Sequence, residues 1–223
     1  MELRAENIGK KYFRDKKSSN FFYAVRELSL DLRAGTVTEV MGRSGSGKST
    51  MLNMFAGLLT PDEGEIYVDE IRLYSLKDEQ RSALRNRCIG VIPQGQTGLH
   101  SLTVMENVKL PCMLYGEGVS DELALSLLER VGIADLKDAY PNELSGGEMR
   151  RLSIARALIR KPGILLADEP TGDLDDENTK AVLSLLRETA DTGTAVLLVT
   201  HESEAAAYAD SVYRMHEGIL TLQ

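Results

Sequence analysis

The feature that most constrains this chain is a glycine-rich stretch that fits the pattern G-x-x-x-x-G-K-[ST] at each fixed position. It consists of Gly42, Arg43, Ser44, Gly45, Ser46, Gly47, Lys48, Ser49 and Thr50, and is called the phosphate loop below. Residues 36–41 alternate like a strand, and residues 49–56 are typical of a helix. Because strand, glycine loop and helix follow one another, the pattern predicts a phosphate-binding loop and not a Gly/Ser linker with a chance lysine.

The residue types in the phosphate loop suit a polyphosphate. Glycines allow backbone N–H groups to point inward, and the start of the following helix adds partial positive charge. By analogy with other such loops, Lys48 is expected to reach the β and γ phosphates, and the Ser49 hydroxyl is expected to bind Mg²⁺. The sequence therefore predicts a site for a nucleoside triphosphate with Mg²⁺.

The composition of the chain limits the class of protein and its expected location. The chain has 223 residues, 43% hydrophobic and 27% charged, as in ordinary globular proteins. No run approaches the roughly 18–20 apolar residues that span a bilayer, and the first residues lack the apolar stretch of a secretory signal, so we expect a cytoplasmic chain. A formal net charge of −8 argues against broad nucleic-acid binding. The densest basic cluster, Lys10 and Lys11 with residues 14–17, is expected to be a solvated loop.

Polar residues follow four of the predicted strands. They are the phosphate loop after residues 36–41, Gln94 after residues 89–92, Asp168 and Glu169 after residues 163–167, and His201 after residues 195–199. Open α/β sheets bind ligands at the carboxyl ends of their strands. The four groups are therefore expected to meet at one edge of a mostly parallel sheet.

Asp168 and Glu169 are adjacent carboxylates at the end of an apolar strand, where unpaired charge is costly. A bound Mg²⁺ would explain Asp168, and Glu169 could then polarise the water that attacks the γ-phosphate. A structural ion pair is the alternative interpretation.

A second glycine-containing stretch opens the predicted helix 149–160. This stretch, Leu144, Ser145, Gly146, Gly147 and Glu148, is called the LSGGE stretch below. Ser145 and Glu148 have the spacing of a capping box. Two glycines in the first turn are locally unfavourable, since each costs about 1 kcal/mol relative to alanine in a helix interior. The stretch is typical either of a plain helix cap or of an anion site at a positive helix end.

The remaining pattern predicts one α/β domain. Residues 2–8 and 25–33 favour an antiparallel edge hairpin, residues 102–161 are helical, and residues 211–215 and 219–222 favour a closing hairpin. We expect residues 1–80 and 162–223 to form the α/β core, with residues 81–161 as an inserted helical subdomain.

With the phosphate loop, Gln94, the LSGGE stretch, the Asp168–Glu169 pair and His201 in this order, the chain resembles the ATP-binding subunit of ABC transporters over essentially its full length. The resemblance implies a P-loop NTPase (RecA-like) core with an antiparallel β edge. It also implies that two subunits form a head-to-tail homodimer with ATP between one phosphate loop and the other subunit's LSGGE stretch. The subunits would sit on integral membrane permeases, peripheral to the inner face of the cell membrane, and no nucleic acid is expected as a partner.

The same resemblance implies roles for individual residues. Ser145 and Gly147 would contact the γ-phosphate of the opposite site, and Asp175 would cross the dimer interface. Glu169 would be the catalytic base, and His201 would contact the γ-phosphate. Gln94 would contact Mg²⁺ and the membrane partner, and Tyr12 would stack on adenine. An aromatic such as Tyr12, judged by the sequence alone, is more often a core or edge residue than a base-stacking one.

A narrower resemblance lies in residues 167–175, 106–108 and 110–111, which are similar to the lipoprotein-releasing, macrolide-export and cell-division group. It implies export or mechanical work outside the membrane. The chain departs from that group at Asp173, Arg150 and residues 95–98. Residues 95–98 lie beside Gln94, so this departure bears on which permease the chain binds. The alternatives are the ATPase of a nutrient importer, a soluble ABC ATPase acting on ribosomes or DNA, and a small-molecule kinase, which the LSGGE stretch and Glu169 disfavour.

Overall fold

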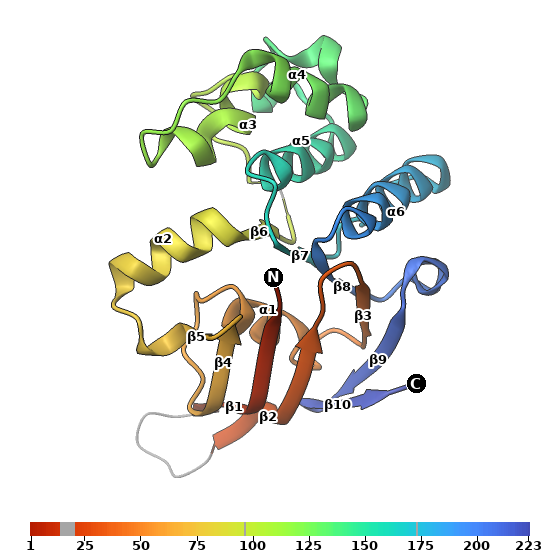
Figure 1. Ribbon diagram of the computed structural model, residues 1–223. Coiled ribbons are helices and arrows are strands. Elements are labelled where there is room, and N and C mark those ends of the chain that lie inside the picture. Colours follow the sequence, from red (N-terminus) through yellow and green to blue (C-terminus); the bar gives the residue numbers. More distant parts are fainter. Residues whose placement is uncertain (14–20, 96, 173) are drawn as a thin grey trace.

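The computed structural model describes residues 1–13, 21–95, 97–172 and 174–223. Two sheets and a group of helices make up the molecule, with the helices α3, α4 and α5 gathered at one end and the amino-terminal strands toward the other (Figure 1). Asp173 and the basic residues 14–17 singled out in the sequence lie outside the described residues.

The first sheet is antiparallel. Its strands, in spatial order, are β2 (Phe21–Leu32), β1 (Leu3–Phe13), β4 (Glu63–Val68) and β5 (Ile71–Arg72). Buried Leu3, Ala5 and Ile8 alternate with more exposed neighbours, which places one face of β1 in the core. The predicted edge hairpin is confirmed, but its strands are longer than expected, because pairing continues through the aromatic residues to Phe13 opposite Phe21.

The second sheet carries the predicted edge. Its order is β10 (Ile219–Leu222), β9 (Ser211–His216), β3 (Val37–Met41), β8 (Ala195–Thr200), β7 (Ile164–Asp168) and β6 (Ile89–Ile92). The strands β9, β3, β8, β7 and β6 run parallel, so the carboxyl ends of β3, β8, β7 and β6 meet at one edge. The closing hairpin is confirmed, since β10 pairs antiparallel with β9.

Residues of β7 and β8 are buried on both sides of the sheet, as expected for central parallel strands. Leu165 and Leu198 face a core shared with helix α6 (Asp176–Asp191) and the helical group. Leu166 and Leu197 face the other core, which holds helix α1 (Lys48–Phe55) and the antiparallel sheet. Helix α1 therefore lies between the two sheets.

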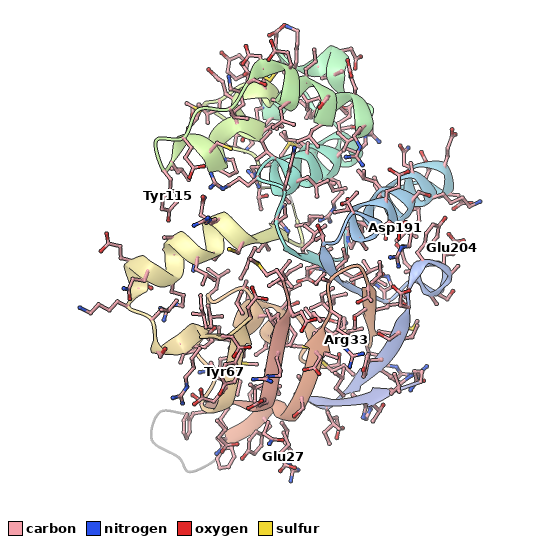
Figure 2. All side chains as sticks on the ribbon, viewed as in Figure 1. Glu27, Arg33, Tyr67, Tyr115, Asp191 and Glu204 are labelled. Atoms are coloured by element: carbon pink, nitrogen blue, oxygen red, sulfur yellow. The ribbon has the colours of Figure 1, made fainter. Side chains whose placement is uncertain are left out.

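The helical group consists of α3 (Val104–Met113), α4 (Asp121–Arg130) and α5 (Gly146–Leu158), with α3 and α4 both packed on α5. One apolar cluster joins these helices to the sheet without a break. Helix α2 (Asp78–Cys88) leads into β6, and the Ser82 hydroxyl lies 3.2 Å from the Tyr115 hydroxyl near the end of α3 (Figure 2). Short 3₁₀ helices complete the chain: Leu73–Ser75, Ala134–Leu136, Pro141–Glu143 and Ser203–Tyr208.

The predicted fold class, an α/β core with an antiparallel edge and inserted helices, is confirmed by this topology. The strand β6 falls inside residues 81–161 but pairs with β7 in the second sheet. The division of the chain into residues 1–80 with 162–223 and residues 81–161 stays a prediction. Within the described residues, no helix combines the length and apolar character needed to cross a bilayer.

Candidate functional site

A cleft of about 910 Å³ opens at the carboxyl edge of the second sheet. Residues predicted from sequence line much of it: Tyr12, Gly42, Ser44, Gly45, Gly47, Lys48, Ser49, Thr50, Gln94, Asp168, Glu169 and His201. They come from β1, the phosphate loop and the ends of β6, β7 and β8. The strand order thus brings together residues that are separated by more than half of the chain.

The backbone of the phosphate loop has a left-handed conformation at two of its glycines. Gly45 and Gly47 have φ of 78° and 108°, in the left-handed region. A Cβ on Gly47 would lie 2.0 Å from the carbonyl oxygen of Ala24 in β2. Gly47 is also the residue before α1 and provides no side-chain cap, so the first N–H groups of that helix are left to bind another acceptor. The loop therefore has the form of an anion cradle.

Lys48 places its ammonium group inside this cradle. The side chain is nearly buried, and Nζ donates to the carbonyl oxygens of Gly42 at 2.6 Å and Arg43 at 3.1 Å. Ser46 is 7% exposed and does not line the cleft, and its part in binding the phosphates stays a prediction. Its backbone N–H donates to Arg43 O, and Ser46 Oγ is buried with no hydrogen-bond partner among the described residues. The Ser46 side chain therefore packs on the buried side of the phosphate loop.

Ser49 and Asp168 face each other as an oxygen pair suited to Mg²⁺. Burial raises the pKa of the Asp168 carboxyl above its ordinary value, and a hydrogen bond from the Ser49 hydroxyl opposes that rise. Mg²⁺ prefers hard oxygen ligands and commonly takes one or two from protein, with phosphate and water supplying the rest. A buried carboxylate that lacks full compensation fits such an ion. Gln94 lines the same cleft and is exposed.

Glu169 is held in a strained backbone conformation at the end of β7. Its φ is 50°, which is uncommon for a residue with a side chain, and its N–H donates to Val199 O in β8 at 2.8 Å. Glu169 Oε2 lies 2.9 Å from His201 Nδ1 and accepts a 3.4 Å hydrogen bond from the Thr200 hydroxyl. The hydrogen bond to Glu169 is the main reason that the pKa of His201 is raised. The carboxylate is thus oriented from the neighbouring strand.

The LSGGE stretch does not line the cleft. Ser145 is exposed and caps α5, where its N–H and hydroxyl both donate to Glu148 Oε2 at 2.7 Å. The predicted capping box is confirmed, and Gly146 is exposed beside it. A Cβ on Gly147 would lie 3.2 Å from the Leu174 side chain, next to Asp175. The LSGGE stretch and the turn before α6 therefore lie together, away from the phosphate loop of the same chain.

Asp175 caps the amino end of α6. Its carboxylate accepts from the Asn178 N–H at 2.8 Å, and this bond lowers the pKa of Asp175. Asp175 is exposed and lies outside the cleft.

Several cleft residues were given no binding role from the sequence: Phe22, Tyr23, Ala24, Gly95, Arg150, Gly172, Glu217 and Gly218. Phe22 stacks on Tyr12 with ring centroids 6.0 Å apart and planes inclined by 30°. The run of aromatics at residues 21–23 beside the predicted hairpin was a usable signal for Phe22. Arg150 was marked as a departure in sequence but was given no role. No local signal points to Glu217 and Gly218, which reach the loop through the bond from Gly218 N to Ser46 O.

Comparison with known proteins places this arrangement in a family. The family pattern described as ABC transporter matches residues 25–172, which is more than half of the chain. The chain is 41% identical to the lipoprotein-releasing system ATP-binding protein LolD of Xanthomonas campestris pv. campestris (strain 8004), over 98% of this chain and 91% of that protein. It is 38% identical to the uncharacterized ABC transporter ATP-binding protein MJ1508 of Methanocaldococcus jannaschii, over 97% of this chain and 96% of that protein.

Two solved structures of MJ0796 have the same fold. One is a dimeric structure of this ABC transporter cassette, with a TM-score of 0.89, 34% identity and coverage of 97% of this chain and 95% of that one. The other is a dimeric post-hydrolysis state bound to ADP and Pi, with a TM-score of 0.90, 32% identity and coverage of 99% and 98%. These matches confirm the resemblance inferred from the motifs, and the chain belongs to the ABC transporter family.

Proposed function

We propose that this chain is the ATP-hydrolysing subunit of an ABC transporter and that it works as a head-to-tail homodimer. One structural observation supports the proposed dimer. The phosphate loop, Asp168 and Glu169 share a cleft, whereas Ser145 and Gly147 lie outside it in the same chain. A second copy that brings its LSGGE stretch to the cleft would complete the set of donors around the γ-phosphate. The dimeric relatives with ADP and Pi support this assembly.

The cleft residues predicted from the sequence have proposed places in ATP hydrolysis. The phosphate loop and Lys48 bind the phosphates, and Ser49, Asp168 and Gln94 hold Mg²⁺. When bound, Mg²⁺ neutralises charge that develops on the phosphate oxygens. Glu169 accepts a proton from the attacking water, since it is the carboxylate beside Asp168 that does not face Ser49.

His201 completes the proposed machinery. Its Nδ1 faces Glu169, which leaves the opposite ring nitrogen for the γ-phosphate. Tyr12 and Phe22 offer an aromatic surface for the base. ATP and Mg²⁺ are therefore the proposed ligands.

The head-to-tail arrangement is tested by mixing two inactive variants. Lys48→Ala disables the phosphate loop of a chain, and Ser145→Arg disables its LSGGE stretch, so either variant alone is expected to lose hydrolysis at both sites. A mixed dimer has one intact site, and an equal mixture is expected to recover up to about a quarter of the wild-type rate by subunit counting. Absence of any recovery, with mixed dimers present by two-colour pull-down, contradicts composite sites.

The relatives support a proposal about the membrane partner and the direction of transport. LolD is named for a lipoprotein-releasing system, and we propose an export or mechanical role in which the chain binds the cytoplasmic side of an integral membrane permease. Purification of tagged chain from detergent-solubilised native membranes, with mass spectrometry, tests this. A permease with a large extracytoplasmic domain supports export. An importer permease with a solute-binding protein contradicts it, and ribosomal or DNA-associated proteins alone contradict the transporter role.

A further inference from the structure

Arg150 is a cation inside the cleft that the proposed roles of its neighbours do not use. It lies in the first half of α5, is 7% exposed, and lines the cleft together with Asp168 and Glu169. Removing a guanidinium group from water is costly unless it is hydrogen-bonded or close to anions. The contacts of Arg150 therefore indicate what keeps it there.

The first contact reaches the segment that carries Gln94. Arg150 Nη1 donates to the carbonyl oxygen of Pro93 at 2.7 Å. The peptide group that joins Pro93 to Gln94 is planar, so a bond that orients this carbonyl also orients the nitrogen and Cα of Gln94. On the carboxyl side of Gln94, Gly95 has φ of 99°, a conformation that favours glycine. Gly95 has no side chain that could hold this part of the chain in place. Arg150 is thus the anchor on the upstream side of Gln94.

Arg150 also lies close to the carboxyl end of β7. The positive charge of Arg150 acts to lower the pKa of Asp168, against the burial that raises it. A Cβ on Gly172 would lie 3.8 Å from Arg150 Nη2, so the guanidinium group passes close to the turn that follows Glu169. One side chain of α5 therefore contacts the segment after β6 and lies close to the end of β7.

We propose that Arg150 is a positioning residue that holds Gln94 beside Asp168 and links that position to helix α5. This inference rests on the proposed role of Gln94 as a ligand of Mg²⁺. The amino end of α5 is the LSGGE stretch, which takes the nucleotide of the opposite site in the proposed dimer. A shift of α5 is then transmitted to the Pro93–Gln94 peptide through the Arg150 guanidinium group, whereas Arg156 of the same helix contacts the chain further on, at Thr97. Arginine suits the task, because its planar fork can serve a carbonyl and nearby carboxylates at once, whereas lysine is a point charge.

A double-mutant cycle on the full-length protein tests this coupling. Arg150→Ala is expected to lower kcat for ATP by about 10-fold, a typical effect of losing a supporting contact behind a metal ligand. The KM for ATP should change little, since the phosphate loop is untouched. In a Gln94→Ala background, Arg150→Ala should lower kcat by less than about twofold, because residues that act through one another are not additive. Arg150→Lys, which keeps the charge, serves in the same cycle if the alanine variant does not fold.

A measurement without nucleotide separates positioning from general damage. Amide hydrogen exchange around residues 92–95 is expected to accelerate by about 10-fold in Arg150→Ala, with β8 unchanged. Arg156→Gln is the matched control: Arg156 lies in the same helix and donates to Thr97 O at 2.7 Å, but does not line the cleft. Arg156→Gln should accelerate amide hydrogen exchange near Thr97 and leave kcat for ATP nearly unaltered.

The outcomes separate the two proposals. If Gln94→Ala has wild-type kcat, the role of Gln94 fails and this inference falls with it. If Gln94→Ala is slow but its effect adds fully to that of Arg150→Ala, the role of Gln94 stands and the inference alone is overturned. Unchanged exchange at residues 92–95 in Arg150→Ala also overturns it.

Discussion

Glu169 Oε2 lies 2.9 Å from His201 Nδ1, which joins the residue after β7 to the residue after β8. The two residues are 32 positions apart in the chain and meet because their strands are parallel neighbours. The contact orients the proposed base, which lines the cleft and has a strained backbone with φ of 50°. A carboxylate placed in this way can take a proton from water without a large rearrangement.

Glu169→Gln is expected to retain ATP binding and to lose hydrolysis by about 100-fold or more, because glutamine keeps the shape of the side chain but cannot accept the proton. An ATP-dependent dimer should accumulate, as measured by light scattering after size-exclusion chromatography. Glu204→Gln, on the outer turn after β8 (Figure 2), is the control and should behave as wild type. Hydrolysis by Glu169→Gln at the wild-type rate contradicts the assignment of the base.

Glu39 gives the chain a pH-dependent stability. It is fully buried in β3, neither carboxylate oxygen has a hydrogen-bond partner among the described residues, and burial raises its pKa from 4.5 to about 7. The folded state therefore holds this proton more tightly than the unfolded state. The stability contribution is complete below about pH 4.5 and is lost as pH rises to about 7.

Glu39→Gln should remove this dependence, because the amide does not ionise. Relative to wild type, the variant is expected to gain about 2 to 3 kcal/mol in free energy of unfolding between about pH 5 and pH 8. Urea denaturation at both pH values measures the difference, with Glu204→Gln as an exposed control. A gain that is equal at the two pH values would show that Glu39 is not the titrating group.

Gly47 and Gly45 form a matched pair for testing the phosphate loop. Both have positive φ, but a Cβ would lie 2.0 Å from Ala24 O at Gly47, whereas at Gly45 it would meet no atom of the described residues within 4 Å. Gly45→Ala should therefore carry only the cost of backbone strain, about 1 to 3 kcal/mol. Gly47→Ala should cost more and weaken nucleotide binding. Thermal unfolding without nucleotide, followed by ATP titration, checks the order; equal losses would rule out the contact with β2.

The stacked rings of Tyr12 and Phe22 are expected to bind the base. Alanine at either position should weaken ATP binding by roughly 10-fold, since base stacking on an aromatic ring is worth about 1–3 kcal/mol. Binding of inorganic triphosphate, which has no base, should change little. Phe13→Ala is the control, because Phe13 is exposed on the same hairpin and does not line the cleft. Equal losses for ATP and triphosphate would place these rings outside the base site.

Local patterns in the sequence were sufficient for much of the molecule. The phosphate loop, the capping box of Ser145 with Glu148 and the apolar runs of β7 and β8 each depend on residues close together in the chain. Their signals are spacing, glycine content and hydrophobic periodicity, which act within one element. The edge at which the strands end was also predictable, because parallel strands share a direction.

The tertiary structure decided which of these parts share a site. Pairing of Val37 with Val196 and packing of α5 against the sheet edge join distant segments, and no local pattern records such contacts. Arg150 enters the cleft because α5 packs against β6, whereas the LSGGE stretch at the amino end of the same helix lies outside the cleft. Sequence by itself determined the elements and their chemistry, whereas long-range packing determined which residues meet in one chain and which require a second copy.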